Sequence, residues 1–503
     1  MTAEDDPPEP PRRRIASGLG LAAAVALPTA VLVVHAARYG SWIIDDAGIT
    51  FAYARSIADG HGIVQQPGAD TVEGYSNPLW VLLHVVGHWL GLFDRGTILG
   101  TPDYVVFPKA LGVGCFLGIL AATHAAARAV VRPAWLVTVV VGLVLAANPS
   151  FVVWTVSGLE NPLYGLAAAL LAALLICATV NDWLLTPPAA VAASLIALMA
   201  ALTRPDGLML AVAYPALAVL LVRKDTWRDG LRSVTVALLG FAVPYGLFLV
   251  WRSRVFGRLV PNTAVAKSQD VPDLSDFGKV RDLLTYPGRW TVVFGAVVVA
   301  FAAARWPPMR RVALAAGVPL ALTLLAYGGL ENDWMGEARF ATPVWVLGSM
   351  LVGLAFVQVL VEAGPWIRVG LAAGTVGAVV VSSTVLLDHQ ATFRQAPTVP
   401  LCLVADRFGR FYNELADRLG VEDGEGSILL PDIGGTLLTS GLTVYDLAGL
   451  TDATIADAYD QDDIQQVRNY VFGEIKPTFI HSHGNWRILG GIEDPRLNRD
   501  YMP

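Results

Sequence analysis

Apolar runs of helical length fill most of the first 387 residues of this 503-residue chain. An α-helix needs about 20 such residues to cross the hydrocarbon core of a membrane. Hydrophobic residues make up 54% of the chain and charged residues only 15%, which is too little polar surface to cover a water-soluble protein of this size. The chain is therefore predicted to be an all-α polytopic membrane protein with about eleven transmembrane helices. The predicted spans are 17–38, 104–128, 133–148, 160–180, 187–203, 206–222, 232–251, 290–306, 312–330, 343–361 and 367–387.

Lysine and arginine residues predict the orientation of these spans. The Arg12–Arg14 cluster precedes the first span, and such residues are enriched in cytoplasmic segments, so the N-terminus is placed in the cytoplasm. The basic turns at 128–132, 223–224 and 305–311 then also face the cytoplasm. The segments 39–78, 252–289 and 331–342 become extracytoplasmic loops. This topology requires the apolar stretch 79–93 to be a short or re-entrant helix, because a further crossing there would move the later loops to the other side.

Composition divides the chain into three parts. Residues 1–16 form a charged cytoplasmic tail, and residues 17–387 form the transmembrane domain. Residues 388–503 are charged and mixed, with short apolar runs at 428–430 and 442–447 that are typical of strands, and a polar helical pattern near 460–473. This last part is predicted to be a small extracytoplasmic α/β domain.

Several functional classes are excluded. The net charge of −7 leaves no basic domain for nucleic acid, and three distant cysteines suggest neither a disulfide framework nor a zinc site. The chain has no phosphate-binding glycine loop, dinucleotide fingerprint or hydrolase nucleophile motif. His84 and His88 have a spacing that can bind metal, but a third ligand is lacking nearby and packing is favoured.

The first external loop, 39–78, carries the strongest candidate chemistry. Asp45 and Asp46 lie at the start of a predicted helix over 46–58, where a carboxylate is stabilised by the helix dipole and free N–H groups. They are therefore either a helix cap with a solvated neighbour, or a general base or metal ligand at the membrane surface. Glu73 adds a third acid, and the length of the loop, with its aromatic and turn residues, is typical of the lid of a cavity.

Cations on the predicted external face form a second group. Extracytoplasmic loops usually carry few lysine and arginine residues, yet these loops contain Lys267, Arg258 and Arg339. Such a cation beside lipid can hold an anionic headgroup such as a phosphate. Pairing with the acids of 331–337 is the alternative. Arg204 and Asp206 lie between two spans, and pairing between them is as well supported as a functional role.

In combination these motifs resemble the polyprenyl-phosphate-dependent membrane glycosyltransferases of the C-type (GT-C) fold, and most of all the actinobacterial terminal β-(1→2)-arabinofuranosyltransferase group. The matching segments are 44–50, 53–55, 60–62, 72–80, 157–160, 203–207, 261–263, 266–267, 333–335, 338–340, 432–434 and 445–452. Two residues depart from the expected pattern. Gly48 stands where a larger, often aromatic residue is expected, and Asn161 where a threonine is expected.

The resemblance implies a function and a set of site residues. A sugar, arabinofuranose in the arabinofuranosyltransferase group, would pass from a polyprenyl-phosphate donor to a cell-envelope glycan such as arabinogalactan, outside the plasma membrane, in cell-wall biogenesis. Asp45 or Asp46 would be the base for the acceptor hydroxyl, with Asp45 slightly preferred. The donor phosphate would be bound by Arg204, Lys267 and Arg339. The sugar and acceptor would be bound by Glu73, Tyr75, Asn77, Glu160, Asn262, Asp333 and Trp334. No cofactor is required by these motifs, and a divalent metal ion stays an open alternative.

Two other functions fit parts of the pattern. A transporter or lipid flippase would also keep charges among its membrane helices, although the long acidic loop and the asymmetric external domain favour an enzyme. A protein O-mannosyltransferase of the same fold would differ only in donor sugar and acceptor.

Overall fold

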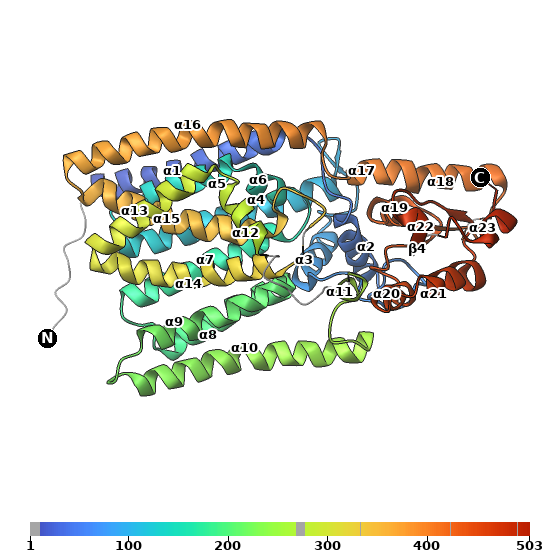
Figure 1. Cartoon of the computed structure of the whole chain (residues 1–503), viewed down its shortest axis with the longest axis horizontal. Coiled ribbons are helices and arrows are strands. Elements are labelled where there is room, and N and C mark those ends of the chain that lie inside the picture. The colour runs from blue at the N-terminus through green and yellow to red at the C-terminus, as the bar shows by residue number, and fades with distance from the viewer. Residues whose placement is uncertain (1–10, 268–276, 332, 423, 490, 503) are drawn as a thin grey trace.

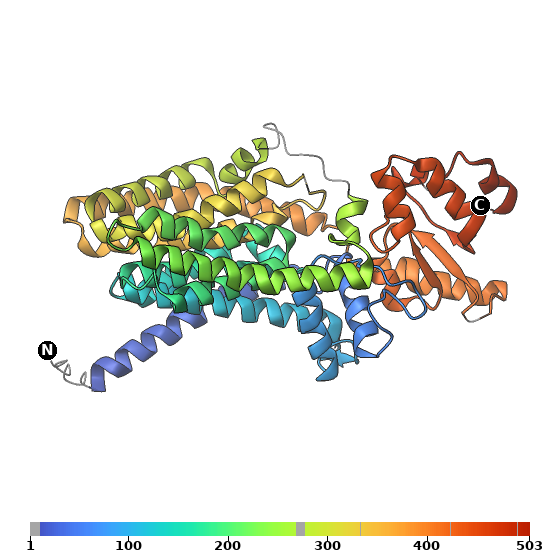
Figure 2. The same cartoon turned by 90° about the horizontal axis from the view of Figure 1, so that it is seen from below.

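The computed structural model describes residues 11–267, 277–331, 333–422, 424–489 and 491–502. Long helices run side by side along the long axis of the molecule, and a small domain built from the C-terminal residues caps one end of this bundle (Figure 1). The view from below shows the same arrangement, with the start of α1 at the end of the bundle that is remote from this domain (Figure 2).

All eleven predicted apolar runs fold as helices. They form α1 (Pro11–Ala37), α4 (Asp103–Val130), α5 (Ala134–Ala147), α7 (Asn161–Val180), α8 (Pro187–Thr203), η1 (Pro205–Val212) with α9 (Ala213–Leu221), α10 (Trp227–Phe256), α13 (Arg289–Arg305), α14 (Pro307–Gly329), α15 (Thr342–Glu362) and α16 (Pro365–Gln395). Among the described residues, seven helices are long and apolar enough to cross a membrane, or up to nine if each of two bent pairs is one span. The predicted count of eleven crossings is reached only if the two shorter apolar segments, Pro187–Thr203 and Pro205–Leu221, also cross, so that count is not confirmed.

Two sharp bends shape the bundle near the site. α5 meets α6 (Pro149–Thr155) at 83°, and α12 (Gly278–Thr285) meets α13 at 90°. At the first bend Asn148 is extended, with ψ at 112°, because a residue before proline is kept out of the helical region and Pro149 has no N–H for the preceding turn. The bend turns α6 sharply away from the direction of α5.

Short elements gather at the end of the bundle that carries the C-terminal domain (Figures 1 and 2). They include α2 (Ala47–Ala58), α3 (Pro78–Trp89), α11 (Asn262–Ala266), η2 (Arg339–Ala341) and the small antiparallel pair β1 (Thr97–Ile98) and β2 (Thr101–Pro102). At 1.5 Å per residue, the 12 residues of α3 span only about 18 Å, which is too short to cross a bilayer.

The C-terminal domain is a small α/β unit, as predicted. Three parallel strands, β3 (Ser427–Leu430), β4 (Thr443–Asp446) and β5 (Phe479–Ile480), pair in the order β4-β3-β5. Its helices are α17 (Leu401–Val404), η3 (Ala405–Arg410), α18 (Phe411–Leu419), α19 (Gly434–Thr439), α20 (Ala453–Asp460), α21 (Ile464–Asn469), η4 (Tyr470–Ile475), α22 (Trp486–Leu489) and α23 (Pro495–Asp500). The helix α16 continues to Gln395, so the domain begins later than the expected boundary at 388.

The domain shares an apolar core with the bundle. Ile44 before α2, Val404 and Ile433 belong to the same cluster of buried residues as the bundle helices. The side chain of Ile44 is fully buried, and its backbone bridges to Pro400 in the segment that leads into the domain. Apolar packing therefore fixes the domain over the start of α2.

Candidate functional site

Asp45 is held on both sides by the C-terminal half of the chain. Its N–H donates to the carbonyl of Val399 at 3.0 Å. Its carboxylate accepts hydrogen bonds from the N–H groups of Gly434, at 3.1 Å, and Gly435, at 2.7 Å. The side chain is only 4% exposed, and burial raises its pKa. A carboxylate occupied in this way anchors α2 to α19 and is poorly placed to receive a proton from a substrate.

Two glycines make this close approach between α2 and α19 feasible. A Cβ on Gly434 would overlap the carbonyl oxygen of Asp45, and a Cβ on Gly48 would overlap the backbone of Gly434. The backbones could not pack together if either position carried a side chain. This contact explains why Gly48 replaces the larger residue expected from the resemblance.

Asp46 has a different environment from its neighbour. It precedes α2 without capping it, remains partly exposed, and makes no side-chain hydrogen bond within the described part of the chain. Burial raises the pKa of Asp46, while the positive charges of Arg339 and Lys267 lower it. The two adjacent acids therefore differ: both carboxylate oxygens of Asp45 accept hydrogen bonds, whereas the carboxylate of Asp46 accepts none from the described residues.

Arg339 is a buried cation with hydrogen-bonding capacity to spare. It is 8% exposed, its guanidinium donates to the sulfur of Met335 at 2.8 Å, and Asp333 lies 3.7 Å away. Its Nε makes no hydrogen bond within the described residues. Leaving such a group unpaired is costly, so an anionic ligand would stabilise it.

The loop before Arg339 has an unusual backbone. Gly336, Glu337 and Ala338 all have positive φ angles, of 73°, 45° and 44°. The left-handed region costs a non-glycine residue about 1–2 kcal/mol, so this turn is maintained by its surroundings. The carbonyl of Glu337 accepts hydrogen bonds from Ser150 and Trp154 of α6. The bend at α6 thus fixes the loop that carries Arg339.

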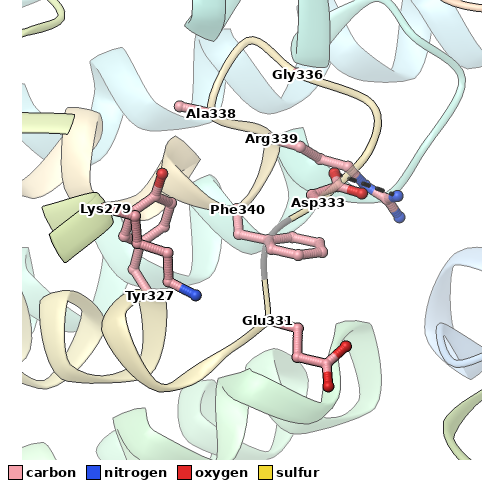
Figure 3. Close-up of a pocket in the computed structure, with 8 residues that line it drawn as sticks. All are labelled: Lys279, Tyr327, Glu331, Asp333, Gly336, Ala338, Arg339 and Phe340. Carbon is pink, nitrogen blue, oxygen red and sulfur yellow. Dashed lines mark ion pairs between the residues drawn. The ribbon is translucent and has the colours of Figure 1, made fainter. Parts of the chain in front are cut away.

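A pocket opens beside Arg339. Figure 3 shows the guanidinium next to Asp333, with the ring of Phe340 between this ion pair and Lys279. The residues that line the pocket are Lys279, Tyr327, Glu331, Asp333, Gly336, Ala338, Arg339 and Phe340. It combines cations, carboxylates and aromatic rings.

Lys267 completes the group of charges around Asp46. It follows α11 and is accessible to solvent. The surrounding protein lowers its pKa by displacing bulk water, and Arg339 lowers it further, while Asp46 and Asp333 have the opposite effect. Asp46, Asp333, Lys267 and Arg339 therefore act on one another electrostatically, although they come from three separate loops.

Arg204 belongs to a buried framework. It donates to Glu160 at 2.8 Å and to Asp206 at 2.8 Å, and its guanidinium lies 4.4 Å from the centre of the Phe340 ring. Asn77 donates to the second oxygen of Glu160 at 2.8 Å. Two acids are thus already paired with Arg204, and Glu160 and Asn77 connect the first loop to α7.

The other expected binding residues are also occupied or lie apart. Glu73 pairs with Arg252 at 2.8 Å, and Tyr75 packs edge-on against Tyr53. Asn262 donates its amide to the carbonyls of the 449–452 turn. Trp334 is 60% exposed and does not line the pocket.

Sequence reasoning missed two residues of this region. Arg252, near the end of α10, is the partner of Glu73, and its position directly after the predicted span 232–251 was a signal for an acidic partner. Asp432 follows strand β3, accepts from His483 at 2.6 Å, and its charge raises the pKa of both Asp45 and Asp46. Its position at the carboxyl end of a parallel strand was the signal for it.

His84 and His88, whose spacing could bind a metal ion, have separate partners in the structure. His84 is buried among aromatic rings and hydrogen-bonds the carbonyl of Trp80, whereas His88 pairs with Asp59. Within the described residues, no group of three or more His, Cys, Asp or Glu side chains is arranged to hold a metal ion.

No protein-family model matches the chain, and no curated protein matches it. Solved structures do. The archaeal oligosaccharyltransferase AglB from Archaeoglobus fulgidus, in complex with an inhibitory peptide and a dolichol-phosphate, is similar over 83% of this chain, with a TM-score of 0.51 and 11% identity. The same enzyme tethered to an acceptor peptide gives a TM-score of 0.51 and 12% identity over 83% of this chain. ArnT from Cupriavidus metallidurans bound to undecaprenyl phosphate gives a TM-score of 0.48 and 14% identity, over 90% of this chain and 80% of ArnT.

The chain has the C-type membrane glycosyltransferase fold. At this identity the likeness concerns the fold alone. The chain spans just under two thirds of the archaeal enzyme, 64% and 63% in the two structures.

Proposed function

We propose that this chain is a membrane glycosyltransferase that takes its sugar from a polyprenyl-phosphate donor. The observation that carries the proposal is that Asp46, whose carboxylate makes no hydrogen bond among the described residues, is coupled electrostatically to Lys267 and to Arg339, whose Nε also lacks a hydrogen bond among those residues. The phosphate of a lipid-linked sugar would accept hydrogen bonds from Lys267 and from Nε of Arg339, which has no hydrogen-bond partner among the described residues, and the lipid chain would lie in the bilayer beside the bundle.

The residues have separate roles in the proposed reaction. Asp46 accepts the proton of an acceptor hydroxyl, whose oxygen attacks the anomeric carbon of the donor sugar. The bond between that carbon and the phosphate oxygen breaks, and the phosphate leaves with the electron pair. Arg339 and Lys267 stabilise the charge that develops on it. Asp45 contributes by holding Asp46 at the start of α2.

The proposed sugar and acceptor follow from the motifs. Their resemblance to the arabinofuranosyltransferase group supports arabinofuranose as the sugar and a cell-envelope glycan as the acceptor. The placement of lysine and arginine supports reaction on the extracytoplasmic face. The C-terminal domain, packed over α2, would form the acceptor side of the site.

Purified protein can test the proposal directly. It would be incubated with polyprenyl phosphates carrying arabinofuranose, mannose or aminoarabinose, with an arabinan oligosaccharide or a peptide as acceptor, and products identified by mass spectrometry. We expect transfer of arabinofuranose to the oligosaccharide. Transfer of mannose to the peptide would support a protein mannosyltransferase instead, and the absence of any glycosylated product would contradict the proposal.

A further inference from the structure

The short helix α11 is held by the C-terminal domain. Asn262, its first residue, is 2% exposed. Its Nδ2 donates to the carbonyl oxygens of Gly449 at 2.8 Å, Leu450 at 3.1 Å and Asp452 at 3.2 Å. An amide engaged in this way is unavailable to a sugar, so Asn262 serves a contact between domains.

A second bridge reinforces the same contact. Arg258 donates to Oδ1 of Asn262 at 3.1 Å and to Asp457 of α20 at 2.7 Å. The N–H of Asn262 donates to the carbonyl of Glu73 at 3.0 Å. The start of α11 is thus bound by the C-terminal domain, by Arg258 in the segment after α10, and by the first loop.

The turn that receives Asn262 has a fixed shape. Asp446, at the end of β4, accepts hydrogen bonds from the N–H groups of Ala448 and Thr451, both at 2.8 Å. These bonds orient the carbonyls of 449–452 toward Asn262. The receiving surface is therefore built by strand β4, remote in sequence from α11.

Lys267 depends on this contact for its position. α11 has five residues, which is about 7.5 Å of helix, and a helix that short is unstable on its own. Lys267 immediately follows it and lies within electrostatic reach of Asp46 and Arg339. The hydrogen bonds at the start of α11 hold the short helix from whose C-terminal end the side chain of Lys267 extends.

We propose that Asn262 is a positioning residue: by binding the 449–452 turn of the C-terminal domain, it fixes α11 and, through α11, the position of Lys267. The inference rests on the proposed function, because it assigns Lys267 to the donor phosphate. Beyond that function, it implies that the proposed phosphate site is complete only when the C-terminal domain holds α11 in place.

A mutant cycle tests the proposal. Polyprenyl phosphate without a sugar serves as the probe, and its affinity for the full-length protein in detergent is measured for wild type, Asn262→Ala, Lys267→Met and the double variant. We expect each single change to weaken binding about tenfold, and the double variant to bind no more weakly than Lys267→Met. Asn413→Ala is the matched control, because Asn413 also holds a turn of the domain, through Thr439, but lies on α18. It should bind as wild type does.

The pH profile of sugar transfer gives a second readout. Moving the ammonium away from Asp46 raises the pKa of that carboxyl. Asn262→Ala should therefore shift the acid limb of kcat/KM to higher pH, as Lys267→Met does, and should shift it no further in the Lys267→Met background. A purely structural role for Asn262 would lower activity at every pH without moving the limb.

Each outcome decides a separate question. Equal weakening by Asn262→Ala in the wild-type and Lys267→Met backgrounds overturns the positioning role, and so does normal binding by Asn262→Ala when Lys267→Met binds weakly. Normal binding by Lys267→Met overturns the assignment of Lys267 itself, and no binding by wild type contradicts the proposed function. If Asn262→Ala unfolds, Arg258→Met, which removes the second bridge at a partly exposed pair, replaces it in the same cycle.

Discussion

The carboxylate of Asp45 accepts a hydrogen bond from the N–H of Gly435 at 2.7 Å, across 390 positions of sequence. This contact joins the first loop to the C-terminal domain. It also separates the roles of two adjacent acids, since Asp45 is engaged in the contact and Asp46 is not.

Asp45→Asn should destabilise the protein. The asparagine amide would place a donor against the N–H of Gly434 or Gly435, and an unsatisfied buried donor costs about 1–3 kcal/mol. Thermal unfolding in detergent checks the loss, which should appear as a lower melting temperature with reduced rather than abolished transfer. A variant as stable as wild type but inactive would instead make Asp45 the base.

The close approach of α2 and α19 predicts a sharp response to one methyl group. Gly434→Ala places a Cβ against the carbonyl oxygen of Asp45 and should cost about 1–3 kcal/mol in the free energy of unfolding. Gly473→Ala is the control, since a Cβ there meets no atom within 4 Å. Comparable melting temperatures for the two variants would show that this contact is not tight in solution.

The pH dependence of transfer should reflect Asp46. A base works only when ionised, so kcat/KM should fall as the pH drops through its pKa, which burial raises above the usual value for aspartate. Lys267→Met removes a charge that lowers this pKa, so the acid limb should move to higher pH, by about one unit or less. If the acid limb of Lys267→Met lies at the same pH as that of wild type, the charge of Lys267 does not act on Asp46.

The domain itself should be sensitive to pH through Asp446. Burial raises the pKa of this carboxyl from 3.8 to about 7. Between these values the folded chain binds the proton more tightly than the unfolded chain, so the contribution of this group to stability is present below pH 3.8 and is lost as the pH rises to about 7. Melting temperatures from pH 4.5 to 7.5 should fall less steeply for Asp446→Asn than for wild type. If the melting temperatures of the two proteins fell equally with pH, the raised pKa of Asp446 would be contradicted.

Much of the fold was readable from the sequence because apolar runs and turn residues are local signals. Every predicted span is a helix, and the runs at 428–430 and 442–447 supply β3 and β4. The bends at Asn148 and before α13 were not predicted, since they depend on packing as well as on proline and glycine. The number of crossings depends on helices too short to decide by length.

The site was readable only in part, because the role of a charge depends on its partner. Asp45 and Asp46 look alike in sequence, and they are distinguished by tertiary contacts: Asp45 accepts from Gly434 and Gly435, and Asp46 is influenced by Arg339 and Lys267. Glu73 was expected to face a substrate, but it faces Arg252, which lies 179 positions away. The sequence shows which loops carry charged residues, and the tertiary contacts show which of these side chains are already paired with another residue of the chain.

The most direct test of the account is the rate of sugar transfer by Asp46→Asn from a polyprenyl-phosphate donor, measured beside its melting temperature. Loss of a general base lowers the rate by about 10²–10⁴-fold. We expect a loss of that size, with the melting temperature of wild type. Wild-type transfer by a normally folded Asp46→Asn would contradict it.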